Sequence, residues 1–357
     1  MRNLNIEETK TLLEQHSGQP LVIAEEALVA AIENPAEESS IAIKVLSVFG
    51  GLLASLAFCG FLFLAGVFSS NWSMLIFGII SIGVGLLIPK FDKKIVWDTS
   101  SAAFYGVGLI CLGIAMESLR FGFNNFLLLG IAIALLTIYL NNSYILTFLA
   151  TLQIIGFKVS WIIMNDIPQL LQVYIAVLAI FLCYLFLNEG RLLLWKFVGW
   201  QRYYPIRTAA LIGALAMLLS GDNYYYVDSG YTNSSWLSSI VVISLVAYLL
   251  FRVSAILGLT SLMQRWAIAA AAIILLAPTL LYVPISYSIL LLLLSFYTRY
   301  RTGFIISIVA FLYFISKFYY DLYYTLLHKS ILLFSTGVLF LICYLLIYKK
   351  LETDEKI

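Results

Sequence analysis

Long apolar blocks constrain this chain more than any other feature. Runs of roughly 15–25 mainly apolar residues recur from Lys44 to Tyr348, and a helix that crosses the hydrocarbon core of a bilayer needs about 20 such residues. Hydrophobic residues make up 62% of the chain and charged residues 11%, against roughly 45–50% and 25% in soluble domains. The runs are unbroken, without the alternation that strands of a membrane barrel require. The sequence therefore predicts an all-α, polytopic transmembrane helix bundle.

About twelve membrane spans of this length fit the sequence. Pro278 and Pro284 interrupt residues 266–298, which form either two full spans or a re-entrant pair. The predicted spans are 44–68, 72–89, 99–118, 124–141, 144–163, 168–188, 205–220, 236–257, 266–282, 285–298, 302–317 and 328–348.

The positions of the cations predict the orientation of these spans. With an even number of spans, seventeen of the 21 Lys and Arg residues fall on the side of the two termini, whereas only Arg120, Lys317 and Lys329 fall in loops on the other side. Short loops rich in Lys and Arg are cytoplasmic. Both termini are therefore expected in the cytoplasm, with a tail over 1–43, a transmembrane domain over 44–348 and a short tail over 349–357.

The first 43 residues are polar and acidic and lack an early apolar region, so no cleavable signal peptide is expected. Two short amphipathic helices are predicted on either side of Gly18 to Pro20. Helices this short are marginal unless they are packed. They form either a docking element for a partner or a solvated tail.

Motifs for catalysis, metals and cofactors are missing. His16 and His328 fall on opposite sides of the predicted membrane, and neither an HExxH motif, a phosphate-binding loop nor a dinucleotide fingerprint is present. The four cysteines are far apart and show no CxxC pairing. The net charge of +2 argues against a nucleic-acid partner. The expectation is a protein that is not an enzyme and has no catalytic residue, no metal and no cofactor.

Ionisable residues inside a membrane are costly and are functional candidates by default. Lys158 lies within the span 144–163, and Glu117 closes the span 99–118 beside Arg120. One interpretation is that Lys158 and Glu117 pair to couple an ion or bind an anion. The alternative is that Lys158 reaches the membrane interface, while Glu117 pairs with Arg120 or meets water.

Two loops mix aromatic and polar residues. The basic segment from Asn188 to Tyr204 is either an interfacial helix or a basic loop with aromatic anchors. The tyrosine-rich segment from Ser220 to Tyr231 is expected to be an outer loop, either a binding surface or an interface cap.

The segment before the last predicted span combines aromatic residues, a Leu-Leu-x-Lys-Ser pattern (Leu326 to Ser330) and an apolar helix with Gly337. This pattern resembles the C-terminal signature of the bacterial membrane family catalogued as domain of unknown function 4401. The resemblance implies no activity, although it mildly favours membership of an envelope complex. A cation at the start of a helix is unfavourable, so Lys329 and Ser330 need a compensating anion: either Asp321, or a lipid headgroup or ligand carboxylate.

Three functions compete at this point. The sequence favours a non-catalytic subunit or scaffold of a bacterial envelope complex, because polar groups are scarce in the spans. Its partners would be the lipid bilayer and other membrane proteins of that complex. A small-solute permease is the alternative, and an enzyme acting on lipid-linked substrates is a more distant one. The expected location is the bacterial cytoplasmic (inner) membrane, in a multi-pass arrangement.

Overall fold

The computed structural model describes residues 70–91, 95–194, 199–227, 236–256, 262–276, 279–280 and 282–321, with isolated positions between 53 and 66 and at 330, 334 and 341. Apart from one short 3-10 turn, the elements in these ranges are α-helices, and strands are absent from them. The helices are α4 (Asn71–Phe91), α5 (Ile95–Ser118), α6 (Phe123–Leu140), α7 (Tyr144–Met164), α8 (Pro168–Leu187), α9 (Glu189–Leu194), α10 (Gly199–Val227), α11 (Trp236–Ile256), α12 (Leu262–Leu276), α13 (Val283–Tyr297) and α14 (Arg301–Asp321).

Local signals explain where several helices begin and end. The Ser143 hydroxyl accepts a hydrogen bond from the Leu146 backbone N–H at the start of α7, and Pro168 opens α8. Helices α5, α7 and α13 end in a turn in which the second residue after the helix has positive φ, namely Arg120 (61°), Asp166 (53°) and Arg299 (55°). In each turn the next residue donates its N–H to the carbonyl five residues back, as in a Schellman motif.

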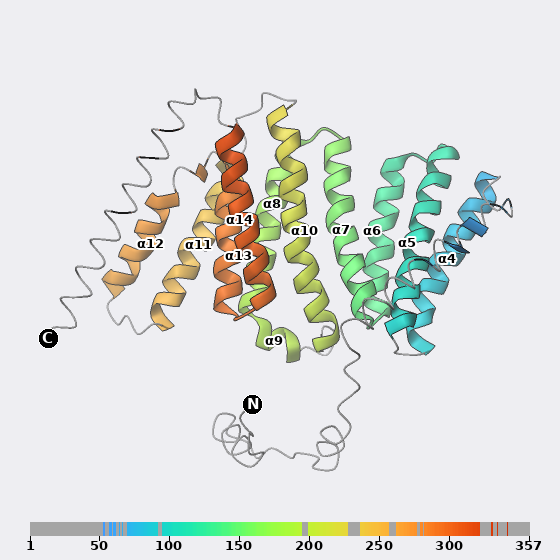
Figure 1. The fold of residues 1–357 in the computed structure, drawn as a ribbon, viewed down its shortest axis with the longest axis horizontal. Helices are drawn as coiled ribbons and strands as arrows, with labels where there is room; N and C mark the ends of the chain where they lie inside the picture. Colours follow the sequence, from blue (N-terminus) through green and yellow to red (C-terminus); the bar gives the residue numbers. More distant parts are fainter. Residues whose placement is uncertain are drawn as a thin grey trace, which may run out of the picture.

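The helices stand side by side in a row that runs from α4 to α12 (Figure 1). Helix α7 contacts α5 and α6 on one side and α8 and α10 on the other. Helices α13 and α14 form a pair that packs on α8, α10 and α11. The chain therefore places α10 near the middle of the row, where 61% of the residues in its membrane-spanning stretch are buried, against 17% for α14.

Two apolar cores hold the row together. The smaller core joins α4 to α7 around Tyr105, Leu127 and Leu146, and the larger joins α7 to α14 around Leu182, Leu211 and other buried side chains. Trp161 on α7 packs against both cores. Helix α7 is thus the seam between the two halves of the bundle.

Small residues bring α4 and α5 into direct backbone contact. A Cβ added to Gly108 would lie 2.6 Å from Ile82 Cγ1 and 2.9 Å from the Gly78 carbonyl oxygen. The Ser101 hydroxyl also donates to the Gly85 carbonyl across this pair, at 2.7 Å. Close approach at small residues is a common way to join membrane helices, and it explains why these two helices form a tight hairpin.

Among the described residues, eight helices are long and apolar enough to cross a membrane, and α13 is a shorter apolar helix. The chain is therefore an integral, multi-pass membrane protein of the all-α class. Ten of the predicted spans have a helix in the structure. The spans 44–68 and 328–348 lie outside the continuous described ranges, and both tails lie wholly outside the described residues, so the count of twelve and the position of the termini stay predictions.

Two boundaries differ from the sequence prediction. Helix α10 begins at Gly199, with Pro205 inside it, whereas the predicted span began at residue 205. It also continues to Val227, so residues 220–227 are helical and not a loop as expected. A proline beyond the first turn removes one backbone hydrogen bond and kinks a helix but does not always end it. Tyrosines are favoured at the membrane interface, where a helix can extend beyond the hydrocarbon core.

The region predicted as two spans or a re-entrant pair forms two separate helices. Helices α12 and α13 have 15 residues each, and both pack against α11. At 1.5 Å per residue each is about 22 Å long, which is shorter than the roughly 30 Å hydrocarbon core. Pro284 lies in the first turn of α13, where its missing N–H is tolerated.

Candidate functional site

Positive charge gathers at one end of the bundle, which we call the basic end. Because successive helices alternate in direction, this end carries the corners α4–α5, α6–α7, α8–α9–α10, α11–α12 and α13–α14 (Figure 1). Eight of the eleven Lys and Arg residues that the structure describes lie at or near it: Lys90, Arg191, Arg202, Arg207, Arg252, Arg265, Arg299 and Arg301. Three of these cations, Arg191, Arg202 and Arg207, come from the α8–α9–α10 corner.

Arg207 is the centre of this corner. Its Nη1 lies 3.2 Å from Glu189 Oε1, and the two side chains are 8% and 28% exposed. Arg207 comes from α10 and Glu189 from the first turn of α9, so the ion pair joins two helices. A charge this buried is stable only when it is paired and surrounded by groups that solvate it.

Aromatic rings surround the guanidinium group, although its buried Nε has no hydrogen-bond partner among the described residues. The guanidinium carbon of Arg207 lies 4.1 Å from the ring centroid of Tyr300, 5.1 Å from Tyr204, 5.3 Å from Tyr203 and 5.7 Å from Phe186. The faces of aromatic rings attract cations, most strongly where water is excluded. We call this arrangement the Arg207 cage. It joins α8, α10 and the loop between α13 and α14.

Tyr300 reaches the cage because of how α13 ends. Arg299 has a φ of 55°, and the Tyr300 N–H donates to the Ser295 carbonyl at 2.9 Å. Gly303 leaves room for the ring, since a Cβ there would lie 2.3 Å from Tyr300 Cδ1. The Tyr300 hydroxyl then lies 3.0 Å from Thr208 Oγ1 on α10. These contacts fasten the α13–α14 loop to α10.

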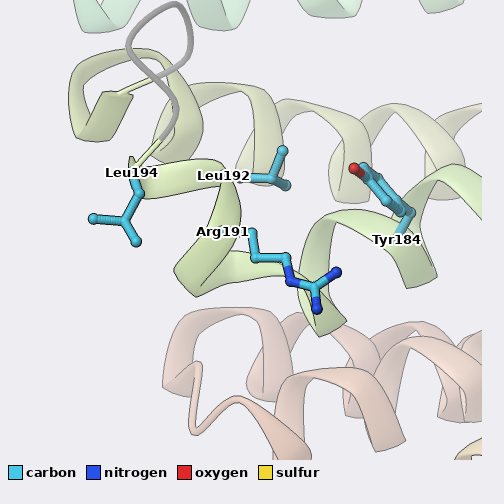
Figure 2. A pocket seen from close by; sticks show the side chains of 4 residues that line it. All are labelled: Tyr184, Arg191, Leu192 and Leu194. Carbon is cyan, nitrogen blue, oxygen red and sulfur yellow. The ribbon is translucent and has the colours of Figure 1, made fainter. Parts of the chain in front are cut away.

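A shallow pocket of about 410 Å3 opens beside the cage, at the junction of α8 and α9. Tyr184, Arg191, Leu192 and Leu194 line it, and Figure 2 shows the Arg191 side chain running from α9 along the pocket towards α8. Arg191 is exposed, and Leu194 is 88% exposed. The pocket therefore combines a cation with an apolar wall.

Arg202 ties the neighbouring corner to the same end. Its guanidinium donates to the backbone carbonyls of Asn141 and Tyr139, at 3.2 and 2.8 Å. The Asn141 amide in turn donates to the Leu86 carbonyl at 3.2 Å. The segment from Asn188 to Tyr204 was predicted as an interfacial helix or a basic loop. Where the structure describes it, this segment forms the short helix α9 and the first turns of α10.

A second polar cluster lies inside the bundle, between α5, α6 and α7. The Tyr105 hydroxyl donates to Gln153 Oε1 at 2.6 Å, and Gln153 Nε2 donates to the Gly130 carbonyl at 2.8 Å. Thr137 Oγ1 lies 3.5 Å from the Tyr105 hydroxyl. We call this group the Gln153 cluster. None of its residues was among the candidates predicted from the sequence, although a glutamine in the middle of an apolar span was a signal for it.

The residues singled out from the sequence lie elsewhere. Lys158 is half-buried with Nζ 4.8 Å from the centroid of the Trp161 ring, and Glu117 is exposed at the end of α5. The structure gives Lys158 and Glu117 no ion pair with each other. Both are in the halves of their helices that lie away from the basic end.

The predicted pairing near the last span is not described. Asp321 is the final residue of α14, and Ser330 is exposed. Lys329 lies outside the described residues, so the compensating anion for that helix start stays a prediction. Within the described ranges, no group of three or more His, Cys, Asp or Glu residues is placed to hold a metal ion.

Comparison with known proteins assigns a family. The family model described as a domain of unknown function, DUF4401, matches residues 41–350. The chain belongs to the DUF4401 family. No curated protein and no solved structure matches this DUF4401 protein. The description of this family names no activity.

Proposed function

We propose that this DUF4401 protein is a non-catalytic subunit or scaffold of a bacterial envelope complex, seated in the cytoplasmic membrane with its basic end towards the cytoplasm. The orientation is supported by the gathering of described cations at one end, which follows the positive-inside rule. The bilayer and neighbouring membrane proteins would be its partners.

The observation that carries this proposal is how the buried polar groups of the spans are used. In the Gln153 cluster, both ends of the Gln153 amide bond to protein groups. The Ser81 hydroxyl donates to the Phe104 carbonyl at 2.8 Å, and the Ser239 hydroxyl donates to the Leu280 carbonyl at 3.0 Å. These groups join helices to one another. Among the described residues, four buried side-chain atoms are left without a hydrogen-bond partner: Thr147 Oγ1, Arg207 Nε, Tyr287 Oη and Ser295 Oγ. Helices joined by interhelical hydrogen bonds of this kind suit a protein that holds others in place.

A permease needs a different arrangement of the polar groups in its spans. Its substrate site lies near the bilayer midplane and is lined by polar groups that converge on the substrate, commonly at broken helices. The polar groups of the Gln153 cluster are instead occupied by each other and by the Gly130 backbone. A small-solute permease is therefore the alternative function, which the experiment below can detect.

Peripheral helices offer the lateral faces that partners could cover. On α14, Ile305, Val309 and Leu312 are 61%, 62% and 59% exposed, whereas Leu290 on the adjacent α13 is fully buried. Lipid alone can cover such a face. A crosslinking experiment distinguishes lipid from protein, because only a protein neighbour gives a product of higher, defined mass.

The test uses the full chain expressed at its natural level in its own cells. A photoreactive amino acid replaces Val309, or Leu290 as a buried control. We expect Val309 to crosslink to one other polypeptide at a fixed stoichiometry, and the Leu290 control to crosslink only within the chain. A protein that migrates as a single unpartnered chain, and that moves a small solute across proteoliposomes, would replace this proposal with the permease.

A further inference from the structure

The α8–α9 corner has an excess of positive charge at a membrane boundary. Arg191 follows the end of the membrane-spanning stretch Gln169–Leu187 by four residues. It is exposed, and it forms no ion pair with an acidic residue in the described ranges. Glu189, the carboxylate in the same short helix, is already bound to Arg207. The positive charge of Arg191 is therefore left for a group outside the described chain.

Two further cations reach the same corner from the α13–α14 loop. Arg299 and Arg301 flank Tyr300 and are both exposed. The Tyr300 ring lies 6.3 Å from the ring of Phe186 on α8 and 4.1 Å from the Arg207 guanidinium. The loop is thus held against the end of α8 at Phe186, which follows the pocket-lining Tyr184 by two residues. Like charges gathered this way are stabilised by an anion.

The walls of the pocket indicate what kind of anion. Tyr184 is 53% exposed and Leu194 is 88% exposed, although both lie on the pocket that contains Arg191. A free phosphate would gain nothing from these apolar surfaces. A phospholipid has a phosphate beside its acyl chains, and tyrosines favour the headgroup level of a bilayer.

We propose that the α8–α9 pocket binds the headgroup of an anionic phospholipid. Arg191 donates to the lipid phosphate, in the forked geometry that guanidinium groups make with phosphate. Arg299 and Arg301 add long-range attraction, and an acyl chain lies along Leu194 and Tyr184. Basic pockets between membrane helices on the cytoplasmic side are a recognised type of lipid site.

The experiment uses the full chain in nanodiscs that contain photoactivatable phosphatidylglycerol in phosphatidylcholine. After illumination, mass spectrometry maps the labelled peptides. We expect the peptide that contains Tyr184 and Arg191 to be labelled by phosphatidylglycerol and only weakly by a phosphatidylcholine probe. Millimolar inorganic phosphate should not compete.

Variants make the assignment specific. Because one Arg near a membrane surface contributes about 1 kcal/mol of attraction to anionic lipid, Arg191→Gln should lower labelling of this peptide about fivefold. Labelling of Arg191→Lys should lie between that of the wild type and that of Arg191→Gln. Arg120→Gln removes an exposed arginine at the opposite end of the bundle and should leave labelling unchanged. Because Arg191 is exposed, its variants should keep the fold, which the unchanged unfolding temperature of each will verify.

Three results would overturn the proposal. Equal labelling of wild type and Arg191→Gln would show that Arg191 does not hold the lipid. Equal labelling by phosphatidylcholine would show an unspecific annular contact. Competition by inorganic phosphate would show that the pocket takes a free anion.

Discussion

The ring of Tyr300 lies 4.1 Å from the guanidinium carbon of Arg207, although the two residues are on different helix pairs of the bundle. This contact, with the Glu189 ion pair at 3.2 Å, holds the α8–α9–α10 and α13–α14 corners of the basic end together. An arginine is suited to this position because its flat guanidinium can stack on a ring while it donates to a carboxylate. The Arg207 cage is therefore expected to be a main source of stability at that end.

Replacing Arg207 with lysine tests that role. The ammonium group keeps the charge but cannot stack flat on Tyr300 while it reaches Glu189. Since a cation–π contact is worth about 0.5–2 kcal/mol, Arg207→Lys should lower the free energy of unfolding by about 1–2 kcal/mol. Thermal unfolding in detergent, followed with a thiol-reactive dye that labels the buried Cys111 and Cys183 as they become exposed, measures this.

The control for this change is Arg252→Lys, since Arg252 is exposed at the same end. Surface substitutions of that kind usually change stability by less than about 0.5 kcal/mol. If both lysine variants unfold at the wild-type temperature, the cage does not stabilise the fold.

The contact between α4 and α5 gives a second prediction. A Cβ at Gly108 would lie 2.6 Å from Ile82 Cγ1 and 2.8 Å from the Ile82 backbone nitrogen, so Gly108→Ala must push the two helices apart. Overpacking of this kind costs about 1–3 kcal/mol. Gly106→Ala is the matched control, because Gly106 is in the same helix and has nothing within 4 Å of its added Cβ. The same unfolding assay should show a loss for Gly108→Ala only, and equal behaviour of the two would contradict the close contact.

The helices themselves were the most predictable part of the fold. Apolar blocks of span length specify helices because a bilayer leaves backbone polar groups no other partner. The end of α10 was not predictable in the same way. Gly221, Asp222 and the tyrosines after them read as a loop by composition, yet the helix continues to Val227. Polarity marks where the hydrocarbon core ends, which is not necessarily where the helix ends.

The Gln153 cluster gives a third prediction. Gln153→Leu leaves the Tyr105 hydroxyl and the Gly130 carbonyl without this partner. Hydrogen bonds between membrane helices average about 0.6 kcal/mol and reach about 1.7 kcal/mol, so Gln153→Leu should cost about 1 kcal/mol. Tyr105→Phe should cost a similar amount. The double variant should cost less than the two changes added together, because both remove the same bond.

The control for the Gln153 cluster is Thr151→Val. The Thr151 hydroxyl donates only to the Thr147 carbonyl within α7, at 2.8 Å, so its loss should affect no other helix. Additive effects of Tyr105→Phe and Gln153→Leu would show that their hydrogen bond does not couple α5 to α7.

The site was less predictable than the fold. Lys158 and Glu117 stood out in the sequence because charges in a membrane are costly, whereas the structure pairs Lys158 with the Trp161 ring. Arg207 was counted as one cation among several in a cytoplasmic segment. Its burial depends on Tyr300, which is 93 residues away in the chain. Sequence periodicity carries no information on which distant loop closes over a residue.

In the turn after α5, glycine is expected to give a more stable variant than alanine does. Arg120 has a φ of 61°, where a side chain with a Cβ is disfavoured by about 1–2 kcal/mol and glycine is not. Arg120→Gly and Arg120→Ala both remove the same exposed side chain, but only alanine keeps the Cβ. The glycine variant should therefore be more stable than the alanine variant by about 1 kcal/mol, after the larger entropy of the unfolded glycine chain is allowed for. At Ser118, in the last turn of α5, the order should reverse, because glycine in a helix costs up to about 1 kcal/mol relative to alanine. Unfolding temperatures of the four variants measure both differences, and a glycine penalty at both positions would contradict the left-handed turn at Arg120.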